Sequence, residues 1–253
     1  MDGAKDVVLA AANSRMVDVY VKYTGMLVGR DKACRLGQYL ARLFVYLVTR
    51  RITHLGKTPL RQSWLATLLR VQQTLSSARK VMRSGKFIGF LQLAMRAQGD
   101  EVERALDVVH KLGMSVFMAA DTWGLLGALL IVQPAPRVAR IGQRAWMYAL
   151  LAQLGAALYR LHGLSLRAAD LRRVRVHVEK AADVVAGREC VVEEQAIGAQ
   201  RRTLMRQAVT AALDLSIPVK GLGVLPLNEG LVALAGTVTS LIGIRDVLAK
   251  AST

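Results

Sequence analysis

The sequence predicts an all-α protein: a membrane-associated helical bundle with amphipathic helices near its N-terminus and a hydrophobic segment near its C-terminus. Three observations predict this class. Only five prolines interrupt the 253 residues, and the long stretches between them are rich in Ala, Leu, Arg and Val. Hydrophobic residues make up 53% of the chain, while its net charge is +17. No run of strictly alternating polar and apolar residues indicates a strand.

A chain that is both this apolar and this basic fits two classes, a membrane protein with basic flanks or a nucleic-acid binder. The positive charge lies mainly in the first hundred residues and in 137–180. It is spread over several helices without a recognition motif, and aromatic residues are only 5%, so we expect no nucleic-acid partner. The two cysteines, Cys34 and Cys190, indicate neither a metal cluster nor a disulfide scaffold.

The first hundred residues are expected to form a basic, amphipathic helical region. Its helices are predicted over 5–24, 31–48, about 60–82 and 86–97, with a turn at 53–59. Region 101–163 is expected to be an apolar helical hairpin that could be embedded in a membrane. Its first helix covers 101–133 and ends at Pro134 and Pro136, and its second covers 138–161.

The remaining chain is divided into two regions. A break at His162–Leu164 is expected to separate 138–161 from a region that covers 164–220. Within this region, 166–186 and 189–213 are expected to form either a pair of helices or one long interrupted helix. Pro218, Gly221, Gly223 and Pro226 then predict a linker. Region 221–253 is expected to be the C-terminal membrane segment, with an apolar helix over 229–249.

Segment 31–48 carries the clearest pattern. At 100° per residue its large apolar side chains fall within about 100° of arc, and Arg35, Gln38 and Arg42 lie on the opposite side. The apolar residues expected to insert into a membrane are Leu36, Leu40, Leu43, Phe44 and Leu47. Such a helix can lie in the headgroup plane, where it expands one leaflet and favours curvature. The same pattern also fits an ordinary helix that faces the core of a bundle.

Basic residues near this helix are candidates for contact with anionic lipid headgroups, each worth about 1 kcal/mol near the surface. The candidates are Lys32, Arg35, Arg42, Arg79, Lys80, Arg83 and Lys86. The last four form a second cluster, which is either membrane-facing or simply solvated. The expected partner of both clusters is an anionic lipid membrane.

Three apolar segments are candidates for membrane insertion. Residues 230–244 contain no charge but rise only about 22 Å, against a hydrocarbon core of about 30 Å. Gly236, Ser240 and Gly243 give this segment a small-residue face that suits close helix packing, although a buried helix of a soluble protein would look similar. Residues 112–132 are long enough to span but contain Asp121, two residues before Trp123. Residues 145–159 have basic flanks on both sides, so we expect them to dip into the membrane or not to cross it.

Motifs for catalysis are not found in the sequence. The four histidines lie far apart without cysteine or carboxylate at ligand spacing, and no nucleophile elbow, zinc-protease motif or phosphate-binding loop occurs. We therefore expect no enzyme activity, no metal and no cofactor.

Several blocks resemble the peroxisomal biogenesis factor eleven (peroxin eleven) family. The first block contains Tyr23, Gly29, Arg30, Asp31, Lys32, Gln38 and Tyr39, together with Lys22, Arg35 and Arg42. A second runs over 75–87, a third contains Asp121 and Trp123 in an apolar helix, and a fourth covers 230–243. The blocks occur in the family's order and span nearly the whole chain.

The resemblance implies a membrane protein of the peroxisome, or of the glycosome where the organism has that organelle. It implies that the first-block helix binds and tubulates anionic membrane, which promotes peroxisome proliferation and division. It also implies self-association and cooperation with a dynamin-related GTPase and its tail-anchored adaptors. An alternative is a pore or metabolite channel in the same membrane, for which Asp121 would be the polar residue within the apolar helix.

Overall fold

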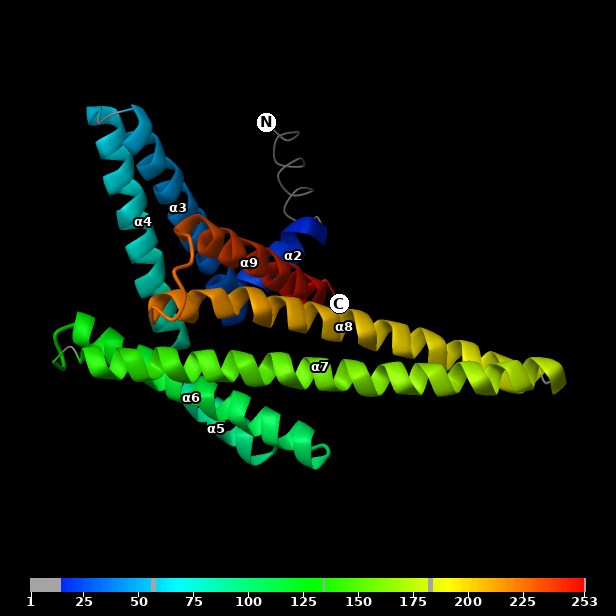
Figure 1. The fold of residues 1–253 in the computed structure, drawn as a ribbon. Helices are drawn as coiled ribbons and strands as arrows, with labels where there is room; N and C mark the ends of the chain where they lie inside the picture. Colours follow the sequence, from blue (N-terminus) through cyan, green and yellow to red (C-terminus); the bar gives the residue numbers. More distant parts are fainter. Residues whose placement is uncertain (1–14, 56–57, 134, 182–183, 253) are drawn as a thin grey trace, which may run out of the picture. The chain divides into compact units, whose positions relative to one another are not determined.

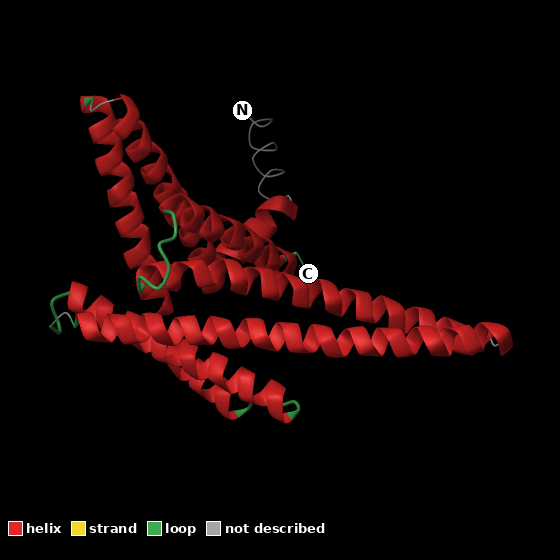
Figure 2. Cartoon of the chain, viewed as in Figure 1, coloured by secondary structure: helices red, strands yellow, loops and turns green. Residues whose placement is uncertain are grey.

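The computed structural model describes residues 15–55, 58–133, 135–181 and 184–252, and these residues form helices joined by short loops, without strands (Figure 2). The predicted all-α class is therefore confirmed for this part of the chain. The helices are α2 (Arg15–Gly25), α3 (Leu27–Leu55), α4 (Pro59–Arg83), α5 (Lys86–Met95), α6 (Glu101–Ala128), α7 (Pro136–Ala181), α8 (Val184–Gly221) and α9 (Glu229–Ala251). The first part of the helix predicted over 5–24 lies outside the described residues.

The chain divides into two compact units. Unit 1 comprises residues up to 84, 121–135 and 223–253, and unit 2 comprises 85–120 and 136–222. The four regions predicted along the chain do not coincide with these units, because unit 1 takes its helices from both ends of the sequence. Helix α6 belongs to unit 2 up to Ala120 and to unit 1 from Asp121.

Within unit 1, α3 packs against both α4 and α9, and α2 packs against α3 and α9 (Figure 1). Helix α4 begins at an N-cap, because the Thr58 side chain accepts a hydrogen bond from the Arg61 amide. Pro59 suits the first helical position, because the backbone N–H that proline lacks would have no acceptor within the helix there. Tyr23 of α2 packs with Val247 and Ala251 of α9. The two ends of the chain are thereby joined in one bundle.

Within unit 2, α7 and α8 form a long antiparallel hairpin, and α6 packs along the first part of α7 (Figure 1). Small residues allow α6 and α7 to approach closely: a methyl group at Gly113 would lie 2.9 Å from the Ala149 Cβ. The Phe117 and Trp146 rings stack beside this seam with centroids 4.8 Å apart. The interior here is built mainly from alanine, including Ala152, Ala156 and Ala157.

The predicted break at His162–Leu164 is wrong, and the predicted linker begins later than expected. Helix α7 runs through His162–Leu164 without a break, because a single exposed glycine costs a helix only about 1 kcal/mol and the hairpin contacts with α8 continue on both sides. Helix α8 continues through Pro218 to Gly221, and the linker to α9 covers 222–228, including the predicted Gly223 and Pro226. The proline removes only one hydrogen bond near the helix end, and its ring is fully buried.

Candidate membrane-binding site

Helix α3 turns its apolar stripe away from the helices that pack against it. Its contacts with α4 are made on the side of Asp31 and Gly37, and its contacts with α9 on the side of Tyr39. Leu36, Leu40 and Leu43 are half-buried on the remaining side, where Phe44 is 50% exposed and Leu47 is 45% exposed. In a bundle folded in water, this stripe would be the part of the helix that the core covers.

The polar face of α3 instead points into unit 1. Asp31 is only 8% exposed, and its Oδ1 accepts a hydrogen bond from Nε of Arg79 on α4 at 3.1 Å. The Arg79 Nη1 donates to Oε1 of Gln38 at 2.7 Å. One buried guanidinium of α4 therefore binds two side chains that lie two turns apart on α3.

A second arginine extends this network to α6. Arg83 lies one turn after Arg79 and donates from Nη2 to Oδ2 of Asp121 at 2.6 Å. Its Nε is also 4.0 Å from the Asp31 Oδ1. Two arginines of α4 thus face two aspartates of α3 and α6, an arrangement that offsets the cost of removing four charges from water.

Opposing electrostatic effects act on Arg79 in this network. Burial lowers the pKa of Arg79, the positive charge of Arg83 lowers it further, and the charge of Asp31 opposes both effects. Removing one carboxylate would leave a buried positive charge without compensation.

Polar contacts also join α3 to α9. Arg35, 8% exposed, donates from Nη2 to the Thr239 hydroxyl at 3.1 Å, and its guanidinium lies 5.6 Å from the centre of the Tyr39 ring. Nearer the surface, Nη2 of Arg42 donates to Oε2 of Glu229 at 2.7 Å. These contacts fix the rotation of α3 about its own axis relative to α9.

The glycines of α9 receive side chains of α3 that recur every seven residues. A methyl group at Gly243 would lie 2.9 Å from Cδ of Lys32, and one at Gly236 would overlap the Tyr39 ring. A methyl group at Gly230 would lie 2.6 Å from the Tyr46 ring, whose hydroxyl accepts from Asn228 at 3.2 Å. The small-residue face predicted for this segment is therefore packed against α3, with Ser240 fully buried within it.

The remaining residues of the first sequence block position α2 against α3. Gly29 leaves no room for a side chain, because a methyl group there would overlap the Tyr23 carbonyl oxygen. The Arg30 Nε donates to the Thr24 carbonyl. The block is thus explained largely by helix contacts: of its charged members Asp31 and Arg35 are buried, whereas Lys22 and Arg30 are exposed.

Several of the basic residues expected at lipid headgroups have protein partners. Arg35, Arg79 and Arg83 engage interior partners in unit 1, and their contact with headgroups stays a prediction. Arg42 is paired with Glu229. Lys32, Lys80 and Lys86 are partly exposed, and Trp123 is 43% exposed.

Other basic side chains do lie on the surface of the two N-terminal helices. Arg50 and Arg51 near the end of α3 and Arg70 on α4 are exposed. Sequence reasoning missed them because they lie outside the most regular part of the pattern. It also missed Thr239 and Glu229, although Asn228 followed by Glu229 is a typical helix start with an acidic first turn.

Among the described residues, α9 is the one helix that is long and apolar enough to cross a membrane by length and composition. The candidate spans at 112–132 and 145–159 do not meet this criterion, since α6 ends at Ala128 and α7 is a long polar helix. The outward stripe of α9 is formed by Leu231, Leu234, Val238 and Leu241. Its polar and small residues face inward, as they do in α3.

A chain whose helices turn apolar side chains outward and bring small and polar side chains together is organised as a membrane protein. The family model of Peroxisomal biogenesis factor 11 (PEX11) matches residues 17–248, so the chain belongs to this family of non-enzymatic peroxisome biogenesis proteins. The resemblance and the expected location in the peroxisomal membrane are thereby confirmed.

Several curated relatives match nearly end to end. Peroxisomal membrane protein PMP27 of Saccharomyces cerevisiae is 29% identical over 90% of this chain and 92% of its own length. Peroxisomal biogenesis factor 11 of Schizosaccharomyces pombe is 24% identical over 85% of this chain and 87% of its own length. Peroxisomal membrane protein 11A of Bos taurus is 23% identical over 91% of this chain and 96% of its own length. No solved structure matches the chain.

Proposed function

We propose that this protein curves and elongates the peroxisomal membrane by inserting the apolar stripe of α3 into one leaflet, and so promotes peroxisome proliferation and division. The observation that carries the proposal is the orientation of α3: Phe44 and Leu47 of its apolar stripe are exposed and its other leucines are half-buried, while Asp31 and Arg35 are buried. A helix held at the interface with its apolar side in the acyl region expands that leaflet and favours curvature.

The bundle around α3 supports this mechanism in two ways. The ion pairs of α4 with α3 and α6 hold the stripe in a fixed direction without using its apolar side chains. Helix α9, the candidate span, would anchor unit 1 while its glycines keep α3 close. Exposed Arg50, Arg51 and Arg70 would supply the attraction to anionic headgroups, about 1 kcal/mol each.

The test is tubulation of phosphatidylcholine vesicles with and without phosphatidylserine by the full-length protein. We expect Leu40→Glu and Phe44→Glu to abolish tubulation but to leave peroxisomal targeting unchanged, because a carboxylate resists insertion into the acyl region. Val192→Glu is the matched control, since it places the same charge at an exposed apolar position of α8. Tubulation that survives both α3 substitutions would contradict the mechanism.

The pore alternative is not favoured. Asp121, the residue that would line such a pore, has its carboxylate in the ion pair with Arg83. A solute flux across vesicle membranes that is lost in a variant of Asp121 would support the pore function.

The proposed partners beyond lipid rest on family resemblance. Self-association, a dynamin-related GTPase and its tail-anchored adaptors stay predictions, as does a glycosomal location in an organism with glycosomes. Cross-linking of the protein in isolated organelles, followed by mass spectrometry, tests the protein partners together.

A further inference from the structure

The hairpin of α7 and α8 in unit 2 encloses a cavity of about 480 Å³. Volumes of about 300–1,000 Å³ are typical of small-molecule sites. Its apolar lining comes from both helices and includes Leu161, Leu164, Leu171, Ile197 and Met205. The apolar floor of this cavity, between the two helices, can therefore contact the hydrocarbon part of a ligand.

The charged, exposed part of the lining, here called the rim, is strongly basic. Three arginines line it, Arg172 and Arg175 from α7 and Arg201 from α8, and Glu194 is the one carboxylate among the lining residues. Nη1 of Arg175 donates to Oε2 of Glu194 at 2.8 Å, so this acid is already engaged. The lining as a whole carries a formal excess of two positive charges. Guanidinium groups arranged in this way favour a carboxylate or phosphate, which they bind with two parallel hydrogen bonds.

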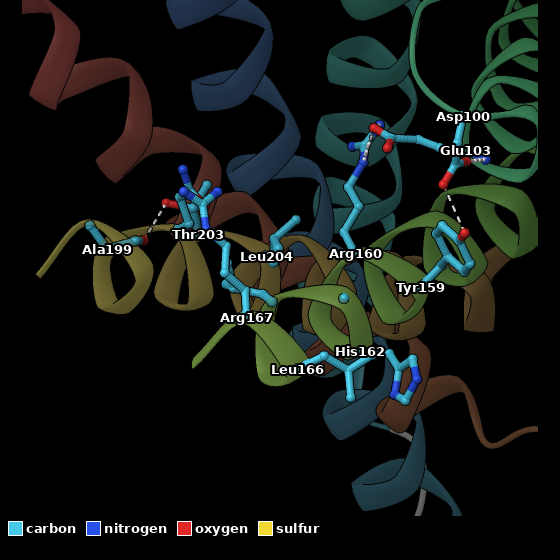
Figure 3. A pocket seen from close by; sticks show the side chains of 13 residues that line it. Asp100, Glu103, Tyr159, Arg160, His162, Leu166, Arg167, Ala199, Thr203 and Leu204 are labelled. Atoms are coloured by element: carbon cyan, nitrogen blue, oxygen red, sulfur yellow. Dashed lines mark hydrogen bonds and ion pairs between the residues drawn. The ribbon is translucent and has the colours of Figure 1, made fainter. Parts of the chain in front are cut away.

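A neighbouring cavity of unit 2 provides the contrast (Figure 3). It is lined by Arg160 and Arg167 but also by Asp100 and Glu103, so its charged residues balance. Arg160 is paired with Glu103 at 2.6 Å, and the Tyr159 hydroxyl donates to Asp100 at 2.8 Å (Figure 3). That cavity has the same kinds of residues but no excess positive charge. A variant in it therefore serves as a control for the effect of charge in the basic cavity.

We propose that the cavity rimmed by Arg172, Arg175 and Arg201 binds an anionic amphiphile, with its carboxylate or phosphate on the arginines and a hydrocarbon chain on the apolar floor. A free fatty acid and an anionic phospholipid both carry this chemistry. The proposal concerns unit 2 alone, so it is independent of membrane curvature by α3.

Photolabelling of the full-length protein in phosphatidylcholine nanodiscs tests the proposal. The probes are a palmitate analogue and a phosphatidic acid analogue, each with a photoreactive group in its chain. We expect at least one probe to label peptides within 161–175 or 194–205. The probe that labels identifies the source of the ligand, and unlabelled palmityl alcohol, which lacks the charge, should not compete.

Substitutions then separate the roles of rim and floor. The double variant Arg172→Gln/Arg201→Gln should weaken labelling about tenfold or more, since it removes two of the three guanidinium groups that would bind the anion. Ala169→Trp, at an exposed position of the lining, should fill the cavity and block both probes. Arg167→Gln, in the charge-balanced cavity, should leave labelling unchanged.

The outcomes decide the proposal directly. Labelling confined to α3 or α9, or labelling of the cavity that the double variant retains in full, would overturn it. Circular dichroism of each variant establishes that the helices are intact. Because the readout is a labelled peptide and not vesicle shape, failure of this proposal is distinguishable from failure of the curvature mechanism.

Discussion

Both units of this protein contain pairs of arginine and carboxylate side chains, but the exposure of these pairs differs. In unit 1 the Arg79 and Asp31 side chains are 10% and 11% exposed, and the Arg83 and Asp121 side chains are 14% and 13% exposed. On the α7–α8 hairpin of unit 2, the side chains of Arg167 and Glu193 are 63% and 40% exposed. Two arginine–carboxylate pairs thus lie in the interior of unit 1, whereas this pair lies on the surface of unit 2.

The difference in exposure indicates which environment, lipid or water, suits each unit. In unit 1 buried charges join the helices, while Phe44 and Leu47 of α3 and several leucines of α9 are exposed, which suits an apolar environment. Where alanines such as Ala156 and Ala157 fill the interior, the charged pairs remain in water. The position of the ion pairs, rather than their number, therefore distinguishes the unit that we propose inserts into lipid.

The largest expected effect comes from breaking an interior pair. Asp31→Ala should lower the free energy of unfolding by about 3–5 kcal/mol, because Arg79 and Arg83 would remain buried without their shared carboxylate. Denaturation in detergent micelles, followed by circular dichroism, measures the loss. A decrease below about 1 kcal/mol would mean that water reaches the network, and the contrast between the units would fail.

A smaller effect is expected at the contact between α3 and α9. Gly236→Leu should lower the free energy of unfolding by about 1–3 kcal/mol, because the new side chain needs the space of the Tyr39 ring. Leu234→Ala, on the outward face of the same helix, is the control and should change stability much less in micelles. Equal losses for the two variants would indicate that α9 does not pack through its glycines.

Much of this architecture could be predicted from the sequence because it depends on local patterns. The period of 3.6 residues in 31–48 predicted both the helix and its apolar stripe, and the small residues of 230–244 predicted a packing face. The direction of the stripe could not be predicted in the same way. A pattern of this kind fits a core-facing and a lipid-facing helix equally well, and only the partners of the polar face decide between them.

Those partners are distant in the sequence. Asp31 meets Arg79 and Arg42 meets Glu229, contacts that no local spacing encodes. The arginines were therefore expected to contact headgroups, the role that exposed basic residues usually have at a membrane. Similarly, the continuation of α7 through Gly163 depends on packing against α8, which overrides a weak local breaker.

A pH-dependent effect is expected in unit 2, at a histidine between α6 and α7. Burial lowers the pKa of His110 below its ordinary value, while its Nδ1 donates to the Ala149 carbonyl at 2.9 Å and Asp107 partly opposes the shift. The unfolded chain therefore takes up a proton at a higher pH than the folded protein. Stability should be full above about pH 6.5 and should fall as the pH decreases from there. Melting curves of the wild type and His110→Gln measure the effect, and a loss that persists in the variant would assign it to another group.

The smallest effect is expected for the exposed pairs of the α7–α8 hairpin. Arg167→Ala should change the free energy of unfolding by no more than about 1 kcal/mol, because water solvates both charges whether or not they are paired. The same substitution should matter even less at high salt, which screens exposed charges but not buried ones. Comparing Arg167→Ala with Asp31→Ala at low and high salt therefore tests the contrast itself. If salt reduced both losses equally, the Asp31 network would be as accessible to ions as the surface of the hairpin, and unit 1 would lack the dry interior from which its orientation toward lipid is inferred.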